Sequence, residues 1–301
     1  MKTRKAYLTY ITSLLLYGLN GVVASHIAMS SYEIVFLRML IGSVLLIGLF
    51  LLLGNRFTFY QKPKDTLFLA ASGIGMGVSG LFVYEAYQQI GVSLSSLLYY
   101  CGPVLVMILS PVLFREKLTW PKIVGFAAVL CGIFLVNGQI FGETSSLWGL
   151  FCGVMSAVTL AVMIICNKKA KGITGMENPT LQLLFGFCTV AVFFLCKQGI
   201  SMEIPAQSIP WILMIGAVNT GLGGFLYFSS IGKLPVQTVA ICGYLEPLSA
   251  VVFSVLLLHE MMLPLQILGA ALILGGALFG ECFQSLGKKT WDENEQQEEQ
   301  V

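Results

Sequence analysis

The sequence predicts an all-α membrane protein in which ten transmembrane helices form two inverted five-helix repeats. Three observations lead to this fold class. Of the 301 residues, 56% are hydrophobic and only 11% are charged, whereas soluble domains carry roughly 25% charged residues. The apolar residues fall into ten separate runs, each close to the length that a helix needs to cross a bilayer. The two halves of the chain also match each other at one fixed offset.

Apolar runs bounded by charge, proline or glycine place the helices along the chain. Within lipid the backbone must satisfy its own hydrogen bonds, so each run is expected to be helical. The first run follows Lys2, Arg4 and Lys5 as in a signal peptide, but it continues to about Ala24 without a polar region, so we interpret it as a retained helix. The expected helices are 6–28, 32–53, 66–89, 93–114, 121–138, 147–166, 179–197, 208–230, 235–258 and 263–283.

The positively charged residues predict the orientation. If the N-terminus is cytoplasmic, 15 of the 17 Lys and Arg residues lie in cytoplasmic segments, Lys197 lies outside and Arg38 lies within a helix. Cytoplasmic segments of membrane proteins carry this excess of positive charge. We therefore expect a multi-pass protein of the plasma (inner) membrane with both termini in the cytoplasm. Residues 286–301 are polar and acidic, which predicts a disordered cytoplasmic tail.

The internal repeat aligns the chain with itself at an offset of 144 positions, without a gap, from about Glu33 to Val136. Apolar residues often match by chance, so the informative pairs are those of Glu, Gly and Pro. They include Glu33/Glu177, Gly42/Gly186, Gly77/Gly221, Gly80/Gly224, Pro103/Pro247 and Glu116/Glu260. Glu116 and Glu260 fall just past the ends of the fourth and ninth helices, where we expect them to anchor the turn into the following helix. An odd number of helices in each unit makes the second copy enter from the opposite side. We expect repeats at 1–138 and 147–285, with a binding site near the midplane where they meet.

Two segments resemble a known family signature. Pro103–Trp120 reads PVLVMILSPVLFREKLTW and its repeat Glu246–Glu260 reads EPLSAVVFSVLLLHE, and both resemble the EamA family. This family belongs to the drug/metabolite transporter (DMT) superfamily, and the resemblance covers 6–283. It implies a ten-helix plasma-membrane carrier that exports amino acids, related metabolites or drugs. Arg38 matches an arginine common in the first half of the family, and Gln182 stands at the equivalent position of the second half.

Three ionisable residues lie inside the predicted helices, where a charge costs roughly 2.5–3.5 kcal/mol at the centre. Glu246 lies about halfway along the ninth helix, so it must be protonated, paired or hydrated. It either exchanges a proton or holds a cationic group, or it braces the kink at Pro247. Arg38 either snorkels to the interface or faces a cavity and attracts a carboxylate. Glu85, near the outer end of the third helix, either reaches external water or contributes to the site.

Pro103 and Pro247 occupy equivalent points of the fourth and ninth helices. Each is expected to kink its helix and to free the carbonyl four residues earlier, that of Tyr99 or Gly243. Broken helices at matching points of two halves indicate a transporter site, although proline kinks also serve packing alone. The surrounding aromatic and amide side chains suit a small amphipathic ligand, and a belt at the membrane interface is the alternative for the tyrosines. The candidates are Tyr84, Tyr99, Tyr100, Tyr244, Asn20 and Asn219.

The leading hypothesis is a secondary active transporter, an exporter that works by alternating access and exchanges protons. Gly287, Lys288 and Lys289 lack the upstream glycine of a P-loop, so we expect a gradient and not ATP as the energy source. The alternatives are an uncoupled facilitator or a lipid-moving protein of the same fold, followed by an intramembrane enzyme. Only His26 and His259 are present and no HExxH or GxSxG motif occurs, so catalysis is disfavoured.

The expected partners are a small-molecule substrate, the lipid bilayer and protons, without nucleic acid. The eight cysteines lie in apolar stretches without CxxC spacing, so we expect no metal or other cofactor. Three GxxxG spacings predict close helix packing, within one chain or in a homodimer. They are Gly73/Gly77, Gly149/Gly153 and Gly276/Gly280.

Overall fold

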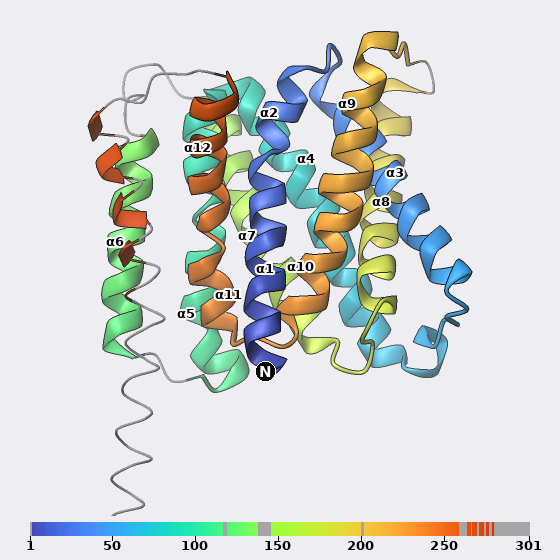
Figure 1. The fold of residues 1–301 in the computed structure, drawn as a ribbon, viewed down its shortest axis with the longest axis horizontal. Coiled ribbons are helices and arrows are strands. Elements are labelled where there is room, and N and C mark those ends of the chain that lie inside the picture. Colours follow the sequence, from blue (N-terminus) through green and yellow to red (C-terminus); the bar gives the residue numbers. More distant parts are fainter. Residues whose placement is uncertain are drawn as a thin grey trace, which may run out of the picture.

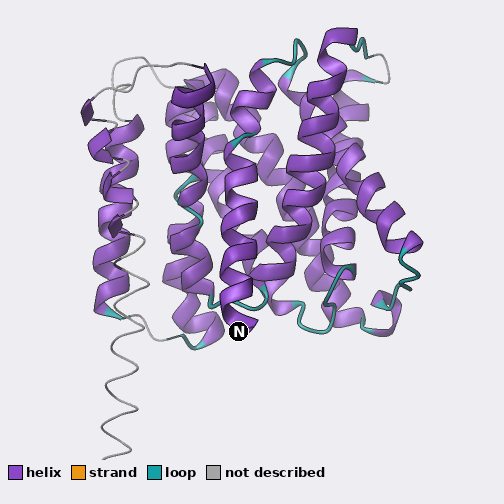
Figure 2. Cartoon of the chain, in the orientation of Figure 1, coloured by secondary structure: helices purple, strands orange, loops and turns teal. Residues whose placement is uncertain are grey.

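A computed structural model describes residues 2–116, 119–137, 146–199 and 202–258, together with short stretches between 264 and 279. All regular structure in these residues is helical, and the helices stand side by side in one bundle (Figures 1 and 2). The N-terminus lies at one end of the bundle, which we call the proximal end. The connection between the second and third helices lies at the opposite, distal end (Figure 1). The predicted all-α class is confirmed.

The elements follow one another with short connections. In chain order they are α1 (Lys2–Gly18), α2 (Asn20–Ser25), α3 (Ser31–Leu52), η1 (Phe59–Gln61), α4 (Pro63–Tyr99), α5 (Gly102–Phe114), α6 (Trp120–Asn137), α7 (Leu147–Lys169), α8 (Glu177–Gln198), η2 (Ala206–Ser208), α9 (Ile209–Leu213), η3 (Met214–Leu222), α10 (Gly223–Ile231), α11 (Val236–Cys242) and α12 (Leu245–Leu258). Several of these elements join end to end, so that a single crossing contains a break.

The described residues contain seven helices that are long and apolar enough to cross a membrane. They are Arg4–Ser25, Ser31–Leu52, Pro63–Ile90, Leu147–Lys169, Glu177–Lys197, Ala206–Ile231 and Val236–Leu257. Two shorter apolar helices, Gly102–Phe114 and Trp120–Gly132, coincide with the predicted fourth and fifth helices. Of the predicted tenth helix at 263–283, the structure describes short helical stretches between 264 and 279, and the predicted tail at 286–301 lies outside the described residues.

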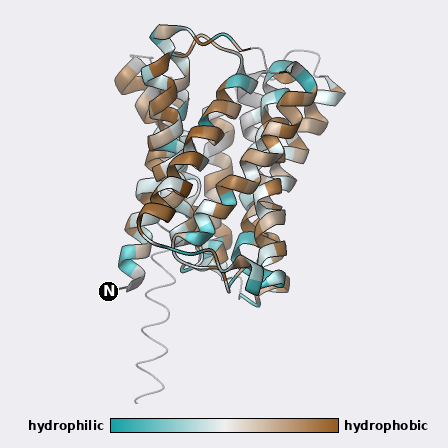
Figure 3. Cartoon of the chain, turned by 90° about the vertical axis from the view of Figure 1, so that its right-hand side faces the viewer, coloured by the Kyte–Doolittle hydropathy of each residue, from teal (hydrophilic) through white to brown (hydrophobic). Residues whose placement is uncertain are grey.

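The outer surface of the bundle is apolar along its middle (Figure 3). Leu52, Val112 and Leu147 are 84%, 79% and 85% exposed, and many other large apolar side chains also face outward. A soluble monomer rarely exposes a continuous apolar surface of this extent. In a bilayer the same surface contacts lipid chains, and hydrophilic residues gather toward the two ends of the helices (Figure 3).

Helix α4 combines the predicted third helix with residues 93–99 of the predicted fourth, without a break in its helical structure. Its first part packs on α7 in the antiparallel direction, because Ser72 donates to the Met163 carbonyl and Ser79 donates to the Ser156 carbonyl. Leu98, near its end, lies against Gly153. The chain therefore reverses between Ile90 and Leu98, close to the predicted boundary at 90–92. No proline interrupts this stretch, so helical turns continue through the bend.

The predicted breaks at Pro103 and Pro247 lie slightly before the prolines. Helix α4 ends at Tyr99 and α5 begins at Gly102, which places Pro103 in the first turn of α5. Pro247 likewise lies in the first turn of α12, after the break between α11 and α12. Proline is tolerated in a first turn because no intrahelical donor is lost there. The prediction that the Gly243 carbonyl loses its donor is wrong, since it accepts from the Glu246 N–H at 3.1 Å.

Glycines bring α4 and α8 into close contact. A Cβ atom on Gly73 would lie 2.4 Å from the Phe185 Cβ, and one on Gly77 would lie 2.8 Å from the Thr189 Cβ. Ordinary contact begins near 3.4 Å, so only glycine permits this helix crossing. The GxxxG spacing at these two positions therefore serves helix packing within the chain, which is one of the two roles that the sequence left open.

Candidate functional site

A cavity of about 170 Å³ lies inside the bundle, where α1, α3, α4, α7, α10 and α11 converge around the two helix breaks. A cavity of roughly 150 Å³ is large enough for a benzene-sized molecule, and open ligand pockets usually exceed roughly 300 Å³. The cavity therefore has room for a small organic solute that is closely enclosed by the helices.

Two side chains of opposite charge face this cavity. Of the described residues that line it, Arg38 of α3 is the one basic residue and Glu246 of α12 is the one acidic residue. Both line the same cavity, and within the described part of the chain they form no ion pair shorter than 4.0 Å. The Arg38 Nε atom is buried and has no hydrogen-bond partner among the described residues. The cavity thus offers a donor and a carboxylate to a ligand.

The chain positions Glu246 through the break between α11 and α12. The residue lies in the first turn of α12, where the helix dipole favours a negative charge. Opposite this break, the Tyr244 hydroxyl donates to the Tyr100 carbonyl at 2.8 Å. Tyr100 belongs to the other break, between α4 and α5, and the two tyrosines are separated by the repeat offset of 144 positions. The two breaks therefore meet directly at the cavity.

The remaining cavity wall is mainly aromatic and flexible apolar surface. Six tyrosines line it, namely Tyr10, Tyr17, Tyr99, Tyr100, Tyr227 and Tyr244. Three methionines, Met39, Met76 and Met163, complete much of the apolar surface. Tyrosine rings bind apolar and cationic groups on their faces, and methionine adapts its shape to irregular ligands. Such a wall suits a small amphipathic solute.

The tyrosines of α1 are held in place by contacts with the second half of the chain. The Tyr10 hydroxyl donates to the Val239 carbonyl at 2.8 Å. Its ring centroid lies 5.4 Å from that of Tyr227, and the Tyr17 centroid lies 5.7 Å from Tyr227. These separations are typical of packed aromatic pairs. The first helix therefore forms one wall of the cavity.

Seven of the eleven predicted site residues line this cavity: Asn20, Arg38, Tyr99, Tyr100, Pro103, Tyr244 and Glu246. Asn219 lies behind the wall, where it is fully buried and donates to the Asn20 side chain at 2.9 Å. Pro247 is buried directly after Glu246. Tyr84 packs against the apolar cluster formed by Val35, Met39 and Val190.

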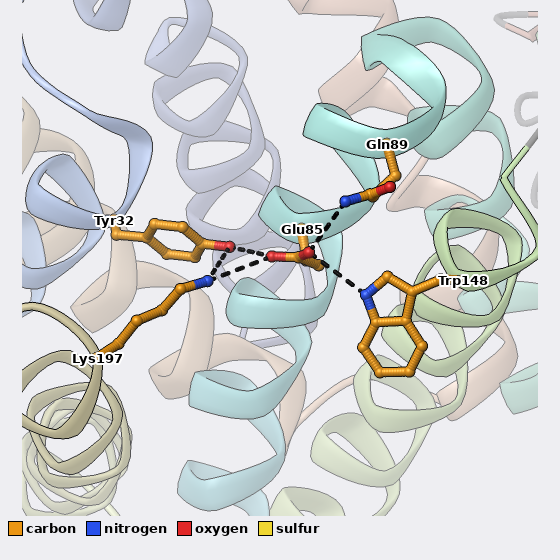
Figure 4. Close-up of polar contacts among 5 residues, drawn as sticks. All are labelled: Tyr32, Glu85, Gln89, Trp148 and Lys197. Carbon is orange, nitrogen blue, oxygen red and sulfur yellow. Dashed lines mark hydrogen bonds and ion pairs between the residues drawn. The ribbon is translucent and has the colours of Figure 1, made fainter.

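Glu85 does not line the cavity but lies in a polar cluster (Figure 4). The cluster is at the distal end, because its Tyr32 is in the first turn of α3, directly after the distal connection. One carboxylate oxygen accepts from the Tyr32 hydroxyl and lies 3.6 Å from the Lys197 Nζ. The other accepts from the Trp148 indole at 3.3 Å and from the Gln89 amide at 3.4 Å. The sequence marked Glu85 as an ionisable residue within a helix, but it did not identify these partners.

Several residues of the cavity wall were not predicted from the sequence, chiefly Tyr10 and Tyr17. Their spacing of seven residues places both on one face of α1, and this spacing is the signal that would have found them. Met39, Met76 and Met163 gave no such signal, because methionine at helical spacing is common in apolar helices.

Glu116 has the structural role that was predicted, but with a different partner. It was expected to anchor the turn into the following helix. Instead its carboxylate accepts from the backbone N–H groups of Val236 at 2.8 Å and Gln237 at 3.1 Å. These are the first residues of α11, so Glu116 satisfies donors that have no partner within their own helix. The contact ties the end of α5 to the start of the broken helix.

Comparison with known proteins identifies similar chains. Residues 4–138 and 147–280 each match the EamA-like transporter family. The chain is 25% identical over 255 residues to the uncharacterized transporter YxxF of Bacillus subtilis, covering 83% of this chain and 80% of that protein. It is also 25% identical over 275 residues to the uncharacterized inner membrane transporter YhbE of Escherichia coli, covering 86% of this chain and 83% of that protein.

A protein of known crystal structure has a similar fold. It aligns with 91% of this chain and 97% of its own length, with a TM-score of 0.78 at 18% sequence identity. Identity at this level shows a shared fold alone. The two family matches cover nearly all of the chain outside its acidic tail. The chain is therefore a multi-pass membrane protein that belongs to the EamA-like transporter family.

Proposed function

We propose that the chain is a secondary active transporter that moves a small amphipathic solute through the central cavity by alternating access. The observation that carries this proposal is the position of the cavity. It lies where two helix breaks meet, and it carries one arginine and one glutamate on an aromatic wall. Transporters of this kind bind their substrates near the bilayer midplane at broken helices.

The proposed architecture consists of two inverted repeats, 1–138 and 147–285. It is supported by the two separate family matches and by the equivalent positions of Tyr100 and Tyr244 at the two breaks. In the proposed orientation the proximal end is cytoplasmic, because the lysines and arginines gather on the side of the N-terminus. The plasma membrane is the proposed location.

Glu246 is the proposed site of proton exchange. A carboxylate inside a membrane is stable when it is protonated, paired with a cation or hydrated. A deprotonated Glu246 holds a cationic group of the solute while Arg38 attracts an anionic group, whereas protonation of Glu246 releases the cationic group. Proton binding and solute binding thereby exclude one another, so that inward proton movement would drive export.

Flux measurements in proteoliposomes test this proposal. Purified protein is screened by thermal shift against amino acids, amines and nucleosides, and each stabilising compound is then assayed for flux under an imposed pH gradient. We expect the gradient to accelerate saturable flux through the native protein. Glu246→Gln removes the titrating group and should abolish this acceleration, whereas the control Glu203→Gln alters an exposed carboxylate and should preserve it.

Two outcomes contradict parts of the proposal. If Glu246→Gln retains the full response to the pH gradient, proton exchange does not occur at this residue and the uncoupled facilitator is favoured. If the native protein moves none of the compounds that stabilise it, the assignment as a solute transporter is wrong.

A further inference from the structure

The polar cluster around Glu85, at the distal end of the bundle, joins side chains from four helices, and Figure 4 shows their contacts. We define the Glu85 cluster as Tyr32 of α3, Glu85 and Gln89 of α4, Trp148 of α7 and Lys197 of α8. Lys197 also donates to the Tyr32 hydroxyl at 3.3 Å, and its Nζ lies 4.4 Å from the centroid of the Tyr32 ring. A single carboxylate thus holds side chains from four helices together.

The cluster lies between the cavity and the distal end. Ser79, Gly80 and Val83 of α4 line the cavity, and Glu85 follows two residues after Val83 on the same helix. In the opposite direction, α4 crosses α8 tightly at Gly73 and Gly77. Met76, within the crossing, also lines the cavity, so the cavity-lining part of α4 runs from the glycine crossing to the Glu85 cluster.

Helices α4 and α8 contact each other at two levels: the glycine crossing can act as a pivot, and the Glu85 cluster holds the helices together farther along. The contact at Gly186 of α8 is eleven residues from Lys197, or about 16 Å along the helix, and Gly77 of α4 is eight residues from Glu85, or about 12 Å. A small rotation about the glycine crossing would separate Glu85 from Lys197. The same rotation would open the space beside Ser79, Gly80 and Val83 toward the distal end.

The contacts of the cluster are suited to breaking and re-forming. The side chains of Lys197 and Glu85 are 47% and 20% exposed, so water can solvate both charges when they separate. Exposed ion pairs contribute little net stability for this reason. The glycine crossing, by contrast, consists of close-packed backbone and Cβ atoms. The helices should therefore separate at the cluster before they separate at the crossing.

We propose that the Glu85 cluster is the distal gate of the cavity. When the Glu85–Lys197 ion pair and the Tyr32–Glu85 hydrogen bond are formed, the route between the cavity and the distal side is closed. When both contacts break, α4 and α8 separate and solute exchanges with the distal side. This inference rests on the proposed transport through the cavity.

The first test measures access to the cavity and requires no transport. A cysteine-free protein receives Gly80→Cys as a reporter, because a side chain added at Gly80 meets no heavy atom within 4 Å and Gly80 lines the cavity. Sealed vesicles of both orientations are treated with a membrane-impermeant thiol reagent. Glu85→Gln should raise the rate of modification from the distal side at least about tenfold, and Tyr32→Phe should raise it less.

Asp65→Asn is the matched control for this test. Asp65 lies in the first turn of the same helix, at the proximal end, and accepts from the Gly172 N–H at 3.0 Å. Its replacement should leave distal access to the reporter unchanged. Equal access in the Glu85→Gln variant and the parent protein, or an equal rise in the Asp65→Asn variant, would overturn the gate. Size-exclusion profiles establish that each variant is folded. If Glu85→Gln is not folded, Lys197→Gln removes the other partner of the ion pair and takes its place in the test.

The second test distinguishes a gate from a static brace. In the variant Glu85→Cys/Lys197→Cys, a short bifunctional methanethiosulfonate joins α4 to α8, and a reductant releases the link. A gate must open during each cycle, so linkage should reduce flux at least about tenfold and reduction should restore it. A brace tolerates linkage, so unchanged flux after efficient linkage would refute the proposal. The corresponding single-cysteine variants control for modification alone.

The two tests separate the gate from the transport function on which it rests. If the native protein moves no solute, the proposed function fails, while the access measurement still decides whether the cluster closes the cavity. If the native protein transports solute but neither access nor flux responds to the cluster, the gate alone is refuted.

Discussion

Replacing Gly73 by alanine measures how closely α4 and α8 must approach. The new Cβ would lie 2.4 Å from the Phe185 Cβ, 2.9 Å from the Gln182 carbonyl oxygen and 3.2 Å from the Gly186 nitrogen. Ordinary contact begins near 3.4 Å, so the helices must move apart by about 1 Å. A gap of that size forfeits roughly a quarter to a half of the dispersion energy of each contact.

The expected cost follows from these distances. Overpacking of a core typically costs about 1–3 kcal/mol, and the higher helix propensity of alanine offsets up to about 1 kcal/mol. Gly73→Ala should therefore lower the free energy of unfolding by about 1–2 kcal/mol. Gly48→Ala in α3 is the matched control, because its Cβ meets no heavy atom within 4 Å. This control should be neutral or stabilising by up to about 1 kcal/mol.

Equilibrium unfolding in mixed micelles, with increasing fractions of a denaturing detergent, measures both variants under one condition. The difference between them matters more than either value, since both carry the same chemical change. If Gly73→Ala is as stable as Gly48→Ala, the close crossing of α4 and α8 is incorrect. The glycine crossing could then not serve as the pivot of the proposed distal gate.

Three further predictions concern the helix breaks and the cavity. Glu116→Ala should lower the free energy of unfolding by about 2 kcal/mol, because two backbone donors of α11 lose their acceptor. Glu116→Gln retains one acceptor oxygen and should lower it by about half as much. Equal losses for the two variants in the same titration would exclude the capping role. Tyr244→Phe should cost about 1 kcal/mol because the Tyr100 carbonyl loses a buried donor, and an unchanged unfolding midpoint would contradict the contact between the two breaks. Arg38→Lys keeps the charge but loses the planar guanidinium, so we expect the Kd of the transported solute to rise about tenfold in a thermal-shift titration; an unchanged Kd would place Arg38 outside the binding site.

The sequence predicted best those structural features that depend on a single segment of the chain. Apolar runs predicted the helices that cross the bilayer, because the length of a crossing depends only on local composition. The prolines indicated the two breaks, but each break lies two to four residues before its proline. A proline fits into the first turn of a new helix, so the chain breaks at the preceding Tyr100–Cys101 and Gly243–Tyr244 instead.

Contacts between distant segments were beyond prediction from the sequence. The cluster around Glu85 joins residues from four helices, and no spacing within any one helix indicates which side chains will meet. Glu116 likewise satisfies donors 120 and 121 residues away, whereas the sequence suggested a partner in the adjacent turn. The reversal within α4 was predicted in position, but the helical structure that continues through it was not.

The most direct test of the central claim is to fill the cavity and measure flux. Gly80→Phe adds a large side chain where the wall is open, since a Cβ there meets no heavy atom within 4 Å. Gly48→Phe adds the same side chain at a position that does not line the described cavity. Transport of the solute identified by the screen should be abolished in Gly80→Phe and retained in Gly48→Phe, with both proteins folded and inserted. Undiminished flux through Gly80→Phe would show that the solute does not pass through this cavity.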